Sequence, residues 1–123
     1  MIRFIHCMKR KEGISTEEFR RFWNSPEFNG LIDSMTQHAL TAEVRKNLTL
    51  DIDLNKALQV ERDAKPAFDG VLEILWPSGG DVAGLVADDA FQQLMGEMEV
   101  LQEGFIDFQE SRRFFTEYVD DRA

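Results

Sequence analysis

Two side chains that can carry protons, His6 and Glu73, stand inside segments that otherwise have the character of β-strands. His6 lies within residues 2–9, and an imidazole is the side chain whose pKa is most easily tuned near neutrality. Glu73 is the charged member of the apolar run 71–76, where a carboxylate needs either a partner or a function. We therefore expect these two residues to be the catalytic candidates. A hydrogen-bonded histidine and a structural ion pair are the alternatives.

Aromatic and basic side chains elsewhere in the chain could surround a small hydrophobic ligand. The residues predicted to bind it are Trp23, Arg45, Trp76, Arg112 and Tyr118. An arginine among them would hold a carboxylate or a developing enolate oxygen, and the aromatic rings would exclude water. Arg45, Arg112 and Arg113 are also the candidate ion-pair partners of Glu73. Core packing is the competing interpretation for both tryptophans.

The sequence contains no pattern typical of a metal or cofactor site. Adjacent strand residues point to opposite faces, so His6 and Cys7 cannot bind one metal together. Residues 51–55 resemble the beginning of a calcium-binding loop, but Lys56 occupies the place of the turn glycine and Arg62 that of the bidentate glutamate. We expect no metal and no cofactor.

Size and charge narrow the class of partner. The chain has 123 residues, enough for one domain that spans residues 1–123. Its 23 acidic and 14 basic residues leave a net charge of −9, which repels nucleic acid and anionic membrane surfaces. One cysteine excludes an internal disulfide, and the amino terminus lacks the pattern of a signal peptide or membrane anchor. These features favour a cytoplasmic protein.

Four segments have the residue pattern of β-strands. They are residues 2–9, 42–50, 71–76 and 108–118. In the second segment apolar and polar residues alternate, which is typical of a strand with one buried face.

Helices are predicted between these strands. Ser15 and Glu18 have the spacing of a capping box at the start of the first helical segment. Pro26 interrupts the apolar pattern of that segment, which is either one kinked helix or two successive helices.

The later helices carry apolar stripes of their own. Asp53 is expected to cap a helix whose inward residues are Leu54, Ala57 and Leu58. A short helix and a longer helix that begins at Asp88 precede the last strand.

The resulting order of elements is strand, helix, strand, strand, helix, strand. This order predicts an α+β fold of the ferredoxin-like βαββαβ type, an antiparallel sheet with helices on one face. The second face would carry apolar residues such as Val71, Leu75 and Phe115, which a second copy of the chain could cover. We therefore expect a homodimer.

Several motifs resemble those of the EthD (ethyl tert-butyl ether degradation) family, within the dimeric α+β barrel group. The motifs are KRKEGIS at residues 9–15, EFRRFW at 18–23, FDGVLE with the following tryptophan at 68–76, and FID at 105–107. Many relatives have a histidine and Pro-Leu after the tryptophan of the first helix. This chain has NSPE at residues 24–27, so chemistry that uses that histidine is absent.

The resemblance implies a ferredoxin-like protomer that pairs sheet to sheet into a dimeric α+β barrel. The family is associated with ether degradation, in which an oxygenase performs the oxidation, and similar domains dehydrate, decarboxylate or cyclise aromatic polyketides. The main hypothesis is a cofactor-free enzyme that performs proton-transfer chemistry on a hydrophobic or aromatic metabolite. The alternatives are a non-catalytic accessory protein for an oxygenase and a haem-handling barrel.

Overall fold

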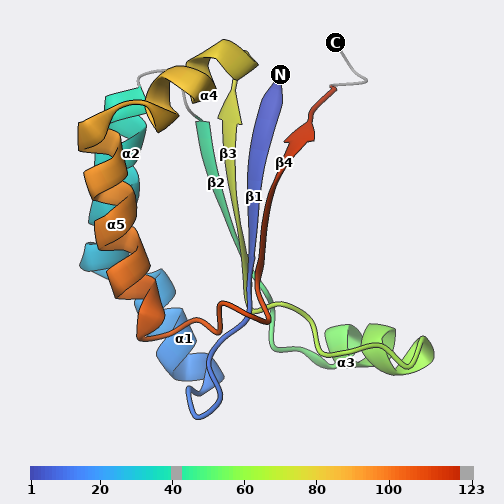
Figure 1. The fold of residues 1–123 in the computed structure, drawn as a ribbon. Coiled ribbons are helices and arrows are strands. Elements are labelled where there is room, and N and C mark those ends of the chain that lie inside the picture. The colour runs from blue at the N-terminus through green and yellow to red at the C-terminus, as the bar shows by residue number, and fades with distance from the viewer. Residues whose placement is uncertain (40–42, 120–123) are drawn as a thin grey trace.

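The computed structural model describes residues 1–39 and 43–119, which form a four-stranded antiparallel sheet and five helices (Figure 1). The strands are β1 (Ile2–Met8), β2 (Glu43–Leu48), β3 (Gly70–Trp76) and β4 (Arg112–Glu117). The helices are α1 (Thr16–Trp23), α2 (Pro26–Ala39), α3 (Asp53–Glu61), α4 (Gly79–Val86) and α5 (Asp89–Glu103). Ala42, the first residue of the second predicted strand, lies outside the described residues. Within the described ranges, no helix has the length and apolar character needed to cross a membrane.

The strands lie in the order β2-β3-β1-β4, and each neighbouring pair is antiparallel. Together with the helices between them, this order is the ferredoxin-like arrangement, so the predicted fold class is confirmed. Figure 1 shows α1, α2 and α5 on one side of the sheet, and α3 beyond the end of the strands, away from α2 and α5. We call the face of the sheet toward α2 and α5 the helix side, and the opposite face the open face.

Short polar motifs determine where the helices begin. Ser15 Oγ accepts the backbone amide of Glu18 at 3.1 Å, which confirms the predicted cap of α1. Asp88 Oδ1 accepts the amide of Phe91 at 3.0 Å and caps α5 in the same way. Pro26 is the first residue of α2, so the interruption separates two successive helices.

An aromatic cluster from α1 and α2 packs on the sheet. Phe19, Phe22 and Trp23 of α1 and Phe28 of α2 are all buried. The indole ring of Trp23 lies against Gly70 of β3, where an added Cβ would come within 2.6 Å of the ring. A residue without a side chain is therefore required where β3 begins.

Helix α3 differs from the prediction in two respects. Asp53 is its first helical residue, whereas Ile52 occupies the N-cap position and makes no side-chain cap hydrogen bond. No residue of α3 is buried, and Leu54 and Leu58 are 65% and 57% exposed. Figure 1 shows α3 beyond the end of the strands and apart from α2 and α5, so the helix layer does not cover it.

Phe115 of β4 lies on the helix side of the sheet, so its predicted position on the open face is wrong. Phe115 lies opposite Phe4 of β1, with ring centroids 5.4 Å apart, and both residues line the same helix-side cavity. Its neighbour Phe114 points to the open face and is 44% exposed. Val71 and Leu75 lie on the open face, as predicted.

Candidate functional site

The sheet register divides the predicted site residues between the two faces. His6 of β1 lies opposite Leu72 of β3 and Arg113 of β4, and all three residues line a cavity on the helix side. Glu73 lies opposite Arg45 of β2 on the open face. Because the sheet separates His6 from Glu73, the two catalytic candidates cannot act together on one small ligand.

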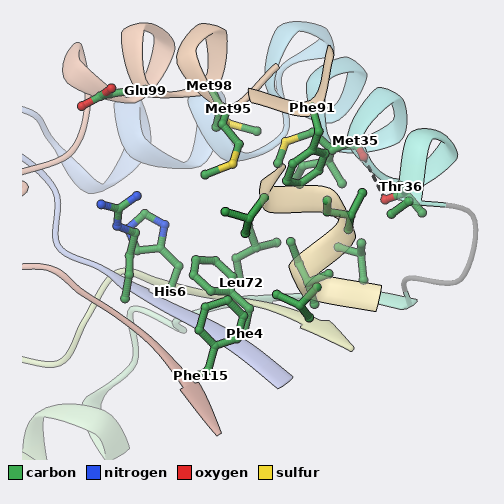
Figure 2. Close-up of a pocket in the computed structure, with 18 of the residues that line it drawn as sticks. Phe4, His6, Met35, Thr36, Leu72, Phe91, Met95, Met98, Glu99 and Phe115 are labelled. Atoms are coloured by element: carbon green, nitrogen blue, oxygen red, sulfur yellow. Dashed lines mark hydrogen bonds between the residues drawn. The ribbon is translucent and has the colours of Figure 1, made fainter. Parts of the chain in front are cut away.

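The cavity between the sheet and the helix layer has a volume of about 240 Å³ (Figure 2). Its walls are mainly apolar, with side chains that include Phe4, Leu72, Phe91, Met95, Met98 and Phe115. The polar residues along it are His6, Thr36, Glu99, Gln102, Ser111 and Arg113. An apolar cavity with a few polar groups is the usual form of a small-molecule site.

His6 presents to this cavity an imidazole whose ring nitrogens have no hydrogen-bond partner among the described residues, although the ring contacts Phe4 edge to face. The residue is 4% exposed, and its ring nitrogens form no hydrogen bond with any residue in the described ranges. Burial, and to a smaller extent the guanidinium of Arg113, lowers the pKa of His6 from 6.5 to about 4. The ring is therefore neutral near physiological pH, with a lone pair that can accept a proton.

Arg113 is absent from the predicted ligand-binding set, although its neighbour Arg112 belongs to it. The side chains of β4 alternate, so Arg113 lies on the helix side with His6, and Arg112 lies on the open face. Arg112 Nη1 donates to the carbonyls of Gln109 and Ser111, both at 2.8 Å. The alternation of residues 112–118 is visible in the sequence, but only the pairing with β1 assigns each arginine to a face.

Two other polar residues of the cavity, Ser111 and Gln102, differ in their side-chain hydrogen bonds. Ser111 Oγ donates to the carbonyl of Asp107 at 2.7 Å and accepts the amide of Lys9 at 2.9 Å, so it fixes the entry into β4. The side chain of Gln102 is buried on α5 and forms no hydrogen bond within residues 1–39 and 43–119. Figure 2 shows the carboxylate of Glu99 pointing away from His6.

Glu73 has structural partners on the open face. Its Oε1 accepts from Arg3 Nη1 at 2.9 Å, and its Oε2 accepts from Asn47 Nδ2 at 3.0 Å. Arg45 instead pairs with Glu43 at 3.0 Å. The predicted arginine partners of Glu73 are therefore wrong, because Arg3 on the adjacent strand β1 is its diagonal neighbour. The structural ion pair, the alternative interpretation of Glu73, is present.

The remaining predicted residues occupy three different environments. The guanidinium carbon of Arg3 lies 4.1 Å from the centre of the Tyr118 ring, so Tyr118 supports the Glu73 ion pair. Trp23 is packed in the aromatic cluster, which fits the core interpretation. Trp76 is buried in the cavity wall, and its Nε1 has no hydrogen-bond partner among the described residues.

Comparisons with known proteins identify the fold. No family model and no curated protein sequence matches this chain. A dimeric protein of unknown function with a ferredoxin-like fold, from Bacteroides fragilis, matches with a TM-score of 0.61 and 10% identity over 95% of both chains. A hypothetical protein from Arabidopsis thaliana matches with a TM-score of 0.57 and 12% identity over 97% of this chain and 88% of the other. The chain is an α+β protein of ferredoxin-like fold with an apolar cavity beneath its helices.

Proposed function

We propose that this chain is an EthD-like protein whose helix-side cavity binds a small hydrophobic metabolite, and that His6 transfers a proton on that metabolite without a cofactor. The observation that carries the proposal is a buried imidazole in the wall of an apolar cavity, with no hydrogen-bond partner in the described part of the chain. A histidine that only stabilised the fold would have its ring nitrogens hydrogen-bonded to the protein.

The size and lining of the cavity favour a compact ligand. Its volume of about 240 Å³ lies just below the range of about 300–1,000 Å³ for drug-sized ligands. Aromatic and thioether side chains from Phe4, Phe115 and Met98 offer contacts to a flat ring. A metabolite of one or two rings fits this space better than a haem group.

The chemistry available to His6 is the transfer of a proton from an acidic C–H bond. The neutral imidazole nitrogen takes the proton, and the electron pair of the C–H bond moves onto an adjacent carbonyl to form an enolate. Where the ligand carries a C=C bond next to the carbon that loses the proton, the enolate extends to a dienolate. Return of the proton from the imidazolium to the far carbon of this dienolate shifts the double bond and completes an isomerisation, with no net gain or loss of electrons. Because burial disfavours the imidazolium, a negative charge on the bound intermediate is needed to stabilise it.

The same depressed pKa supports the alternative of a non-catalytic binding protein for an oxygenase system. A carrier needs the apolar cavity but does not need a base, and a histidine with a pKa of about 4 is a weak base. The two functions predict the same ligand occupancy, and only turnover distinguishes them.

We also propose that the protein works as a homodimer that pairs through the open face. Phe114 is 44% exposed there, and Val71 lies on the same face. A second copy over this face would cover these apolar side chains. The Bacteroides fragilis protein with the same fold is described as dimeric.

The proton-transfer proposal can be tested with the bicyclic ketone 2-tetralone, which has acidic C–H bonds beside its carbonyl. We expect the protein to accelerate exchange of these hydrogens in heavy water, as followed by NMR. His6→Phe, which keeps a buried ring but removes the nitrogens, should abolish the acceleration. His38→Phe, which changes the other histidine outside the cavity lining, is the matched control and should leave it intact. Equal exchange rates in His6→Phe and the unmodified protein would refute catalysis by His6, and binding without exchange would favour the carrier function.

A further inference from the structure

We propose that Arg113 is the anion-binding residue of the cavity and that the natural ligand is a hydrophobic monoanion, such as an aromatic carboxylate or an enolised ketone, with its charged oxygen between Arg113 and His6. This inference rests on the proposed function, because it assumes that the helix-side cavity is the ligand site. It assigns to Arg113 the role that the sequence suggested for Arg112 or Arg45.

The geometry of β1 and β4 places the two groups together. His6 and Arg113 are directly opposed partners across this antiparallel strand pair, and both line the cavity. Side chains of opposed partners lie on the same face of a sheet, with their Cβ atoms about 5 Å apart. A ligand oxygen can therefore contact the imidazole and the guanidinium at the same time.

The charges around the cavity leave Arg113 without a counterion. In the described part of the chain, the titratable residues that line the cavity are His6 on β1, Glu99 on α5 and Arg113 on β4. Arg113 has no carboxylate within ion-pair distance among the described residues. The carboxylate of Glu99 points away from His6 (Figure 2). A bound anion would neutralise Arg113 and would also remove part of the repulsion that lowers the pKa of His6.

The lining defines the rest of the ligand. One uncompensated cation favours a single negative charge, and a polyanion such as a nucleotide would meet a protein with a net charge of −9. Away from His6 and Arg113 the walls are mainly apolar, with Leu72, Phe91 and Met98 among them. The ligand class that matches both regions has a flat hydrophobic body and one anionic oxygen group.

Binding of 2-naphthoate and of its uncharged isostere 2-naphthamide, measured by isothermal titration calorimetry, tests the inference. We expect the unmodified protein to bind the acid about tenfold more tightly or better than the amide, the effect of one charge-assisted hydrogen bond. Arg113→Gln should remove this preference. Arg112→Gln, which removes the same charge one residue away on the other face, should retain it. Equal affinity for the acid and the amide, or a preference that survives Arg113→Gln, would overturn the inference, as would failure of 2-naphthoate to bind.

A second measurement reports on the arrangement of the two groups. In NMR titrations of the imidazole nitrogens, 2-naphthoate should raise the pKa of His6 in the unmodified protein and not in Arg113→Gln. An unchanged His6 pKa on saturation with 2-naphthoate would show that the anion lies elsewhere. Exchange of 2-tetralone tests the proposed function separately, because that ligand is neutral. If His6 is required for exchange but the acid is not preferred, the inference about Arg113 fails while the proposed function stands.

Discussion

Protonation of His6 should make this protein less stable in mild acid, and the size of the effect follows from the structure. The native pKa is about 4, against 6.5 for an unperturbed histidine, and the residue is 4% exposed. The unfolded chain therefore binds more protons than the native protein between these two values, so stability rises with pH in this window. The contribution of a neutral His6 is complete above the unfolded pKa and is lost as the pH falls toward the native pKa. Lowering the pH from 7 to 5 should cost about 2 kcal/mol through this residue alone.

The assay is urea denaturation at a fixed protein concentration over this pH range, with the unmodified protein compared with His6→Phe. Other titrating groups contribute to both proteins, so the difference between the two pH profiles isolates His6. Between pH 7 and pH 5, we expect the free energy of unfolding of His6→Phe to fall by about 2 kcal/mol less than that of the unmodified protein. Parallel pH profiles would mean that His6 is accessible to water or hydrogen-bonded in the native protein, and that its burial does not lower its pKa.

Three further changes test other parts of the structure. Gly70→Ala should lower the free energy of unfolding by about 1–3 kcal/mol in urea denaturation, because the new methyl group would overlap the Trp23 ring. In the proposed homodimer, Phe114→Glu should produce monomers in analytical ultracentrifugation, whereas Val100→Glu on the exposed surface of α5 should not. A dimer that survives Phe114→Glu would exclude pairing through this part of the open face. Glu73→Gln should destabilise the fold by about 1–2 kcal/mol, because it removes the ion pair with Arg3. The same variant should leave the exchange of 2-tetralone unchanged. Loss of exchange would return Glu73 to the catalytic candidates.

Local signals in the sequence were sufficient to predict the fold class. The cap formed by Ser15 and Glu18 is present in the structure, and Pro26 separates two helices. These features depend on residues a few positions apart, so sequence spacing alone encodes them. The strand and helix order then restricted the topology to the ferredoxin-like arrangement, which the structure has.

The composition of the site could be predicted only in part, because it depends on strand pairing. Alternation shows that Arg112 and Arg113 point to opposite faces, but the pairing of β4 with β1 decides which one joins His6. In the same way, Glu73 takes its partner from Arg3 of an adjacent strand, a contact between residues 70 positions apart. Residue types in the sequence identified the candidates, and tertiary pairing sorted them into a cavity group and an open-face group.

The α3 helix illustrates a further limit of sequence periodicity. Leu54 and Leu58 are spaced as one apolar stripe, and in a monomer such a stripe is expected to face the core. In the structure these residues are 65% and 57% exposed. Periodicity identifies an apolar surface, but it cannot specify whether the same chain or a second copy covers that surface.

If the cavity lined by His6 and Arg113 is the ligand site, a crystal structure of the protein with 2-naphthoate will show the ligand there. We expect electron density for the ring system between Phe4, Phe115 and Met98, with the carboxylate against Arg113. Ligand density on the open face beside Glu73, with the helix-side cavity empty, would show that the cavity is not the ligand site.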